Sequence, residues 1–231
     1  MKPVFSKRST CRARVSLWDT MVSILLVDDH TIFRDGLKRL LHEENDLRVA
    51  AETADAGEAL LCLRTTPIDV VLLDINMKGR SGLDILPSIK AEKPALPVII
   101  LSMYPAETYA LRALDAGASG YIAKDMDFHE LVTCIRRVAA GSKYFPAEIL
   151  DRVLRHSRSD DAEEAPQAKL SSREFEIMML IVKGQRLTDI GTQLFLSVKT
   201  VSTYRNRIMQ KLNLGNNAEL VQYALRHKLI D

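Results

Sequence analysis

Three carboxylates, a hydroxyl and an ammonium group each follow a short apolar run in this sequence. The apolar runs have the length and composition of strands buried on both faces, as in a parallel sheet that is covered by helices. Because the carboxyl ends of parallel strands meet at one edge of the sheet, we expect the five polar side chains to lie together at that edge. They are Asp28, Asp29, Asp74, Ser102 and Lys124.

Three carboxylates in one place repel one another, because each negative charge raises the pKa of its neighbours. A bound cation removes that repulsion. Magnesium suits such a cluster, since it is a hard ion that takes oxygen ligands, keeps several water molecules and bridges to phosphate. The sequence therefore predicts a Mg²⁺ site beside Asp74. A lone aspartate after a strand is more often a loop starter or a helix cap, so the prediction depends on the whole set of residues.

The elements that position these residues alternate between strand and helix patterns from Met21 onward. This alternation is typical of βα units and a parallel sheet. Apolar residues recur at helical spacing between the strands, and prolines stand where the chain returns from a helix to a strand. The sequence therefore predicts an α/β fold with a doubly wound, five-stranded parallel sheet over residues 21–145.

The acid pair, the strand-end aspartate, the serine and the lysine together resemble the receiver domain of two-component response regulators, which has a flavodoxin-like fold. The likeness covers residues 21–145. It implies that Asp74 is the phosphoacceptor, which takes a phosphoryl group from a phosphohistidine on a partner kinase. It also implies that Mg²⁺ is bound by Asp28, Asp29, Asp74 and the backbone carbonyl of Asn76.

The same resemblance assigns three residues to the response to phosphorylation. Ser102 corresponds to the hydroxyl residue that moves toward the phosphoryl group, and Lys124 corresponds to the cation that pairs with that group. Tyr121 corresponds to the aromatic residue that changes position on phosphorylation. We expect Tyr121 to turn inward when Asp74 is phosphorylated. The chain departs from the family pattern where Met77 is followed by Lys78 instead of proline, and where Ser102 replaces the commoner threonine.

His30 directly follows the acid pair. We interpret it as an ordinary polar residue and not as a metal ligand, because no second histidine lies at ligand spacing. A phosphorelay role is also disfavoured, since a receiver accepts a phosphoryl group and does not present one.

The charges of the chain are unevenly distributed, although the net charge is only +2. Acidic residues are in excess over residues 21–145 and in the linker that follows, whereas basic residues are in excess over 1–20 and 169–231. The basic C-terminal part is therefore the candidate for binding a polyanion. The 3 cysteines form no CxxC pair, and no run approaches the length of a membrane span, so we expect a cytoplasmic protein with no membrane contact.

Two segments lack the periodicity of a folded domain. Residues 1–20 are basic, and we expect either a disordered extension or a mis-assigned start with Met21 as the true beginning. Residues 146–169 predict a connecting helix followed by an acidic, solvated linker.

The C-terminal segment, residues 170–231, predicts a small all-α domain. Ser171 followed by Glu174 is a capping-box signature, and the later segments predict two short helices joined by a tight turn. The segment resembles the LuxR-type helix-turn-helix domain of the NarL and FixJ regulators, through Leu-Ser-Ser-Arg-Glu, Ser-Val-Lys-Thr-Val from residue 197 and Glu-Leu-Val-Gln-Tyr-Ala from residue 219. It departs from that pattern at Gly191, where alanine is common, and this glycine should soften the helix.

Helical geometry assigns roles on the helix that begins at Val198. Val201, Ile208 and Leu212 fall on one face and should pack inward, which leaves the opposite face for the major groove of DNA. On that outer side, Asn206 is suited to pair with an adenine edge, whereas basic side chains neutralise phosphates. The predicted DNA-binding residues are Lys199, Thr200, Ser202, Thr203, Arg205, Asn206 and Arg207.

The two likenesses together predict a DNA-binding response regulator and not an enzyme, since a receiver catalyses only its own aspartyl phosphorylation and dephosphorylation. Phosphorylation should promote dimerisation through the surface of residues 106–116, 118–122 and 127–140. The expected partners are a sensor histidine kinase, double-stranded DNA, RNA polymerase and a second copy of the chain.

Two alternatives remain at this stage. One is a DNA-binding regulator that works independently of phosphorylation. The other is a magnesium-dependent phosphatase of the haloacid dehalogenase type, which is disfavoured because Asn76 stands where that family has its acidic aspartate.

Overall fold

The structure is a computed structural model that describes residues 21–77, 81–104, 106–147, 149–151, 169–227 and 229–230. Our expectations for residues 1–20, for Lys78 and for most of the connection over 146–169 lie outside the described residues. No helix in the part of the chain that the structure describes is both long enough and apolar enough to cross a membrane.

Residues 22–123 contain a five-stranded sheet in which all paired strands are parallel, in the order β2-β1-β3-β4-β5. This confirms the predicted sheet and its doubly wound order. The strands are β1 (Val22–Val27), β2 (Leu47–Thr53), β3 (Val70–Asp74), β4 (Val98–Ser102) and β5 (Gly120–Ala123).

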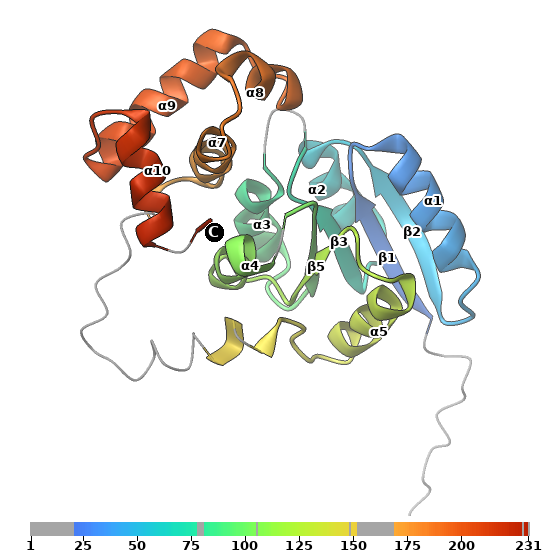
Figure 1. The fold of residues 1–231 in the computed structure, drawn as a ribbon. Helices are drawn as coiled ribbons and strands as arrows, with labels where there is room; N and C mark the ends of the chain where they lie inside the picture. The colour runs from blue at the N-terminus through green and yellow to red at the C-terminus, as the bar shows by residue number, and fades with distance from the viewer. Residues whose placement is uncertain are drawn as a thin grey trace, which may run out of the picture.

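Helices cover both faces of the sheet, because successive strand residues point to opposite sides. In β1, Ile24 and Leu26 pack with α1 and α5, whereas Leu25 and Val27 pack with the helices of the other face. Figure 1 shows the two layers of helices on either side of the strands. The helices are α1 (Thr31–His42), α2 (Ala56–Thr65), α3 (Gly82–Glu92), α4 (Ala106–Asp115) and α5 (Phe128–Ala139).

The C-terminal domain is all α, as predicted, and is drawn in orange to red in Figure 1. Ser171 and Glu174 form the predicted capping box at the start of its first helix. Gly191 has a packing reason, because a Cβ at this position would lie 2.8 Å from the carbonyl oxygen of Leu196. The helices are α7 (Ser172–Val182), α8 (Leu187–Gln193), α9 (Val198–Leu212) and α10 (Asn217–Arg226).

The two domains are in contact through α7, which lies against α3 and α4. Phe175 of α7 is buried, with its ring edge-on to Tyr109 at 5.2 Å between centroids. The guanidinium group of Arg112 lies 4.2 Å from the centre of the Phe175 ring and donates a hydrogen bond to the carbonyl oxygen of Leu170 at 3.0 Å. The C-terminal domain is therefore packed against the N-terminal domain next to the carboxyl edge of its sheet.

Candidate functional site

The carboxyl edge of the sheet brings together residues from four strand ends, as predicted. Asp74 ends β3 and Ser102 ends β4, whereas Asp28 and Lys124 directly follow β1 and β5. The ammonium group of Lys124 lies 2.7 Å from Asp28 Oδ2 and 2.8 Å from Asp74 Oδ2. One lysine therefore bridges two carboxylates that are fully buried.

Burial determines the electrostatics of this cluster. The pKa of Asp74 is raised chiefly by burial and also by the charge of Asp28, while the nearby Lys124 partly opposes the increase. The ring of Phe33 lies 4.5 Å from the ammonium nitrogen of Lys124 and covers it on one side. The site thus holds more negative than positive charge in a region with little water, which favours a further cation.

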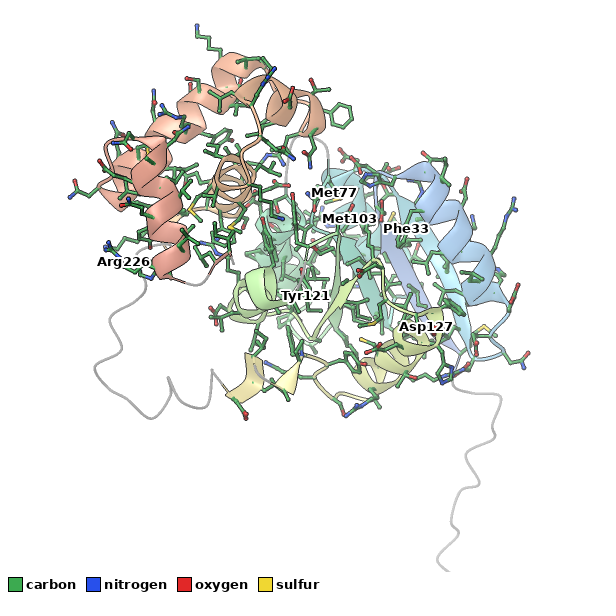
Figure 2. The ribbon with its side chains drawn as sticks, viewed as in Figure 1. Phe33, Met77, Met103, Tyr121, Asp127 and Arg226 are labelled. Atoms are coloured by element: carbon green, nitrogen blue, oxygen red, sulfur yellow. The ribbon has the colours of Figure 1, made fainter. Side chains whose placement is uncertain are left out.

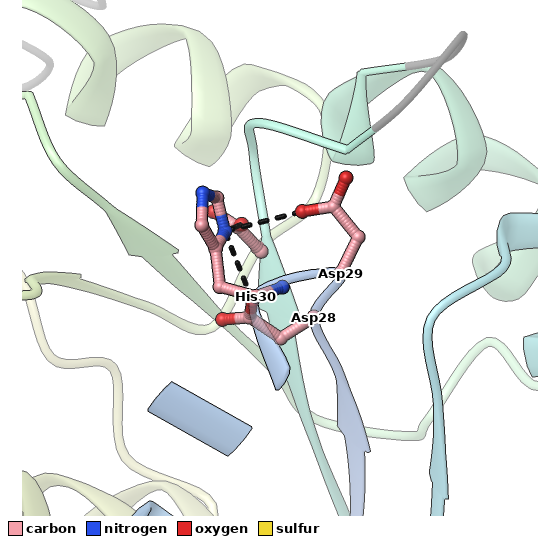
Figure 3. Close-up of side chains that lie close together, drawn as sticks. Asp28, Asp29 and His30 are labelled. Atoms are coloured by element: carbon pink, nitrogen blue, oxygen red, sulfur yellow. Dashed lines mark hydrogen bonds and ion pairs between the residues drawn. The ribbon is translucent and has the colours of Figure 1, made fainter. Parts of the chain in front are cut away.

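Four side chains at this edge offer one ligand atom each within 4.8 Å of one another, and they belong to Asp28, Asp29, His30 and Asp74. Figure 3 shows the first three side by side. Asp74 Oδ2 is buried and pairs with the ammonium group of Lys124 at 2.8 Å, and a carboxylate oxygen has a second lone pair that can bind a cation. Carboxylate oxygens are the ligands that Mg²⁺ prefers, so the residues present fit this ion.

The loop after β3 approaches the site closely. The backbone N–H of Asn76 donates to Asp74 Oδ1 at 3.1 Å, which fixes the orientation of that carboxylate. Gly82, the first residue of α3, lies so close that a Cβ there would be 1.9 Å from the carbonyl oxygen of Asp74. The sequence offered no sign that Gly82 is needed, whereas the structure allows only a glycine in this backbone position.

Ser102 and Tyr121 both point into the protein. Ser102 is buried, and its hydroxyl accepts a hydrogen bond from the backbone N–H of Tyr104 at 3.0 Å. The side chain of Tyr121 is only 2% exposed, and its hydroxyl donates to the carbonyl oxygen of Tyr104 at 2.8 Å. We expected Tyr121 to turn inward on phosphorylation, but here it is already inside, because Tyr104 supplies an acceptor for its hydroxyl (Figure 2).

A chain of aromatic rings leads from this site to the C-terminal domain. Tyr104 stacks on Tyr109 with 4.8 Å between centroids, and Tyr109 contacts Phe175 of α7. Ser102 is therefore connected to α7 through two tyrosines. Sequence reasoning missed this connection, since Tyr104 and Phe175 lie far apart along the chain and carry no motif.

A buried carboxylate of the C-terminal domain also faces the site. Glu176 is fully buried, and its carboxylate accepts hydrogen bonds from Asn76 Nδ2 at 2.5 Å and from the Arg173 guanidinium group at 2.6 Å. Burial raises the pKa of Glu176, and the charge of Asp74 acts in the same direction. Negatively charged groups of the two domains thus lie close together, and the sequence analysis did not single out Glu176.

A cavity of about 230 Å³ lies between the two domains at this edge. The receiver contributes Asp29, His30 and Asn76, together with Met77 and Met103, which Figure 2 labels at the edge that faces the DNA-binding domain. The other wall comes from the turn after α8, at Gln193, Leu194 and Phe195. A small molecule fits a cavity of this size. A second protein could reach Asp29 and His30 through the cavity only if the turn at Gln193, Leu194 and Phe195 moved away.

The predicted DNA-binding residues lie on α9. Val201, Ile208 and Leu212 are buried, as predicted for the inward face. Arg205 is half-buried, and its Nε donates to Asn217 Oδ1 of α10 at 2.7 Å, so this side chain also ties α9 to the last helix. The predicted residues with exposed side chains are Lys199, Thr203, Asn206 and Arg207, and those with half-buried side chains are Thr200, Ser202 and Arg205.

Family models match both parts of the chain. Residues 24–136 match the response regulator receiver domain, and residues 168–224 match the bacterial regulatory proteins of the luxR family. The combination defines a class of protein in which a receiver is joined to a DNA-binding domain.

Curated relatives agree along nearly the whole chain. The response regulator UvrY of Escherichia coli (strain K12) is 36% identical over 90% of this chain and 96% of its own length. The oxygen regulatory protein NreC of Staphylococcus haemolyticus is 38% identical over 91% of this chain and 100% of its own length. A structure of RcsB from Salmonella enterica serovar Typhimurium bound to the promoter P1flhDC, in the presence of the phosphomimetic BeF3-, has 25% sequence identity and a TM-score of 0.54, and covers 88% of this chain and 97% of that one. The chain belongs to the NarL/FixJ-type response regulators.

Proposed function

We propose that phosphorylation of Asp74 controls DNA binding by this response regulator. The observation that carries the proposal is the ammonium group of Lys124, held within 2.8 Å of Asp74 Oδ2 at a buried carboxylate cluster. Phosphoryl transfer needs positioning and charge neutralisation more than covalent chemistry from the protein. Lys124 supplies a fixed positive charge there, and the Ser102 hydroxyl lies at the end of the next strand.

Asp28, Asp29, Asp74 and the backbone carbonyl of Asn76 would hold Mg²⁺ at this edge. When bound, the ion supplies positive charge that offsets the charge of a phosphoryl group. The chain's own residues do the rest. The Asn76 N–H orients Asp74, and Lys124 keeps Asp28 and Asp74 together despite their repulsion.

The contacts of α7 give phosphorylation a route to the second domain. A phosphoryl group on Asp74 adds negative charge and acceptor oxygens close to Asn76, which donates to the buried Glu176. Phosphate oxygens compete for the Asn76 amide and repel the Glu176 carboxylate, so the packed arrangement is destabilised. Movement of Ser102 toward the phosphoryl group would also disturb its bond to Tyr104, and with it the stack that reaches Phe175.

The partners follow from this mechanism. A sensor histidine kinase supplies the phosphoryl group, and the exposed face of α9 binds double-stranded DNA. Release of α7 would free the receiver to form a dimer, which places two recognition helices on an inverted repeat. RNA polymerase is the expected target on the promoter, and the cytoplasm is the expected location because the DNA is there. The receiver acts catalytically only on its own aspartyl phosphate.

The experiment that tests this function uses beryllofluoride, which mimics a phosphoryl group on aspartate. The DNA is a duplex that the protein has selected from a random pool. Beryllofluoride should raise the affinity of the protein for this duplex, and sedimentation should show the protein change from monomer to dimer. Moving a two-state equilibrium from 1:99 to 99:1 takes about 5.5 kcal/mol, much of which charge-assisted hydrogen bonds to the mimic can supply.

Arg112→Ala removes a contact between the two domains and should raise the affinity for DNA without the mimic. If mass and affinity stay unchanged in protein that binds beryllofluoride, regulation is independent of phosphorylation.

A second prediction separates base reading from phosphate contacts on α9. Asn206→Ala should weaken binding to the selected duplex by roughly 1–3 kcal/mol and leave binding to random DNA unchanged, if its contact to adenine is bidentate. Lys199→Ala should weaken binding to both duplexes and reduce the slope of log affinity against log salt by about one unit. Both side chains are exposed, so neither change should affect folding. Equal losses on both duplexes for Asn206→Ala would exclude a reading role.

A further inference from the structure

The imidazole of His30 points at the carboxylates of the metal cluster. Its Nδ1 lies 3.2 Å from Asp28 Oδ1, 3.1 Å from Asp29 Oδ1 and 3.4 Å from Asp74 Oδ2. Figure 3 shows the ring nitrogen facing the carboxylate oxygens of Asp28 and Asp29. The histidine that we interpreted from sequence as an ordinary polar residue therefore lies within the ligand cluster, although no second histidine is near it in the sequence.

These separations match the spacing of ligands around one ion. Neighbouring ligands of an octahedral ion with bonds of about 2.1 Å lie about 3.0 Å apart, because they subtend a right angle. The three oxygens and the nitrogen all lie within 4.8 Å of one another, so small side-chain shifts would let a single cation bind all four. Lys124 pairs with Asp28 Oδ2 and leaves Asp28 Oδ1 to face His30. At Asp74, Lys124 and His30 both lie near Oδ2, so an ion would share this oxygen with Lys124.

The backbone holds His30 in this position. Its N–H donates to Asp28 Oδ1 at 2.8 Å, and its carbonyl oxygen accepts from the N–H of Arg34 in the first turn of α1. His30 stands at the N-cap of α1, yet its side chain makes no capping hydrogen bond. The imidazole is 57% exposed and lines the cavity between the two domains. An ion can therefore reach the ring from that cavity.

A nitrogen ligand changes which ions the site prefers. Mg²⁺ takes oxygen ligands and dehydrates reluctantly, whereas imidazole suits the divalent transition metals. On this basis, and resting on the metal-dependent phosphorylation proposed above, we propose that His30 Nδ1 is a metal ligand that makes the site selective for Mn²⁺ over Mg²⁺.

The test is pulsed electron paramagnetic resonance of the full-length protein loaded with Mn²⁺. An imidazole bound directly to Mn²⁺ produces a ¹⁴N modulation of the electron spin echo. The wild-type protein and His42→Ala should show this modulation, since His42 lies at the far end of α1, and His30→Ala should lack it. Calorimetric titration should show that His30→Ala weakens Mn²⁺ binding by at least about tenfold and leaves Mg²⁺ binding within about twofold.

His30→Ala removes no capping hydrogen bond of α1, but it does remove the contact of Nδ1 with Asp28 Oδ1. Circular dichroism therefore checks that the variant is folded. Bound Mn²⁺ without the nitrogen signal, in wild-type protein that is still labelled at Asp74 with Mg²⁺, would overturn the role of His30 and leave the proposed function intact. Equal losses of Mn²⁺ and Mg²⁺ affinity in His30→Ala would also overturn the selectivity. Failure of both ions to bind, together with failure of labelling, would count against the proposed function itself.

Discussion

Replacing Asp74 with alanine should abolish labelling of the protein by a radioactive acyl phosphate. Asp74 lies at the end of the central strand, where its carboxylate pairs with Lys124 and accepts a hydrogen bond from the Asn76 N–H. Asp28 shares Lys124 but follows the neighbouring strand β1. The measurement is the ³²P retained on the denatured protein. We expect the signal to fall to background, because the acceptor atom is removed.

Three comparisons make this result interpretable. Asp84→Ala changes an exposed acid of the same domain and should leave labelling unchanged. Asp29→Ala should retain labelling but require more Mg²⁺, since this residue is proposed only as a metal ligand. Asp74→Ala should still fold, because Lys124 keeps Asp28 as a partner and one of two repelling buried carboxylates is gone. Label that survives in Asp74→Ala would place the acceptor elsewhere.

Gly82→Ala should cause the largest loss of stability of any change proposed for this chain. The added Cβ would lie 1.9 Å from the carbonyl oxygen of Asp74 and 3.2 Å from the side chain of Leu73. The closer atom belongs to the backbone of a central strand, so α3 or β3 must shift. Overpacking typically costs about 1–3 kcal/mol, and a clash with backbone belongs at the upper end of that range. A loss of about 3 kcal/mol corresponds to a fall in the thermal unfolding midpoint of roughly 6–12 °C.

Gly36→Ala is the matched control. Gly36 lies in the middle of α1, and nothing stands within 4 Å of an added Cβ. Alanine loses less conformational freedom than glycine in a helix, so this change should stabilise the protein by roughly 0.5–1 kcal/mol. Gly82→Ala should also slow labelling of Asp74, because the strand end moves, whereas Gly36→Ala should not. A Gly82→Ala protein with unchanged stability would show that the loop after β3 yields easily.

The central part of the receiver was predictable because its information is local. Buried parallel strands have sequences of short apolar runs, and the polar residue that ends each run lies at the same edge of the sheet. Asp28, Asp74 and Lys124 therefore converge as the sequence predicts, with Lys124 within ion-pair distance of both acids. The capping box at Ser171 and the buried face of α9 follow from local patterns for the same reason.

The orientation of Tyr121 was not predictable, because it depends on an acceptor from another element. The family pattern leads one to expect a side chain that turns inward on phosphorylation. In this protein the carbonyl oxygen of Tyr104 already accepts the Tyr121 hydroxyl at 2.8 Å. Burying a tyrosine requires a partner for its hydroxyl, and the sequence does not say whether a neighbouring loop provides one.

The candidate site residues could be predicted from the sequence, since the residue types and their places at strand ends follow from the period of the apolar pattern. How close the other groups come depends on the tertiary structure. It brought Glu176 to Asn76 across 100 positions of the chain, set a glycine against the Asp74 carbonyl, and turned the His30 imidazole toward three carboxylates. These contacts depend on the packing of side chains and domains in three dimensions, which residue spacing does not encode, and they decide what a phosphoryl group or a metal ion meets at the site.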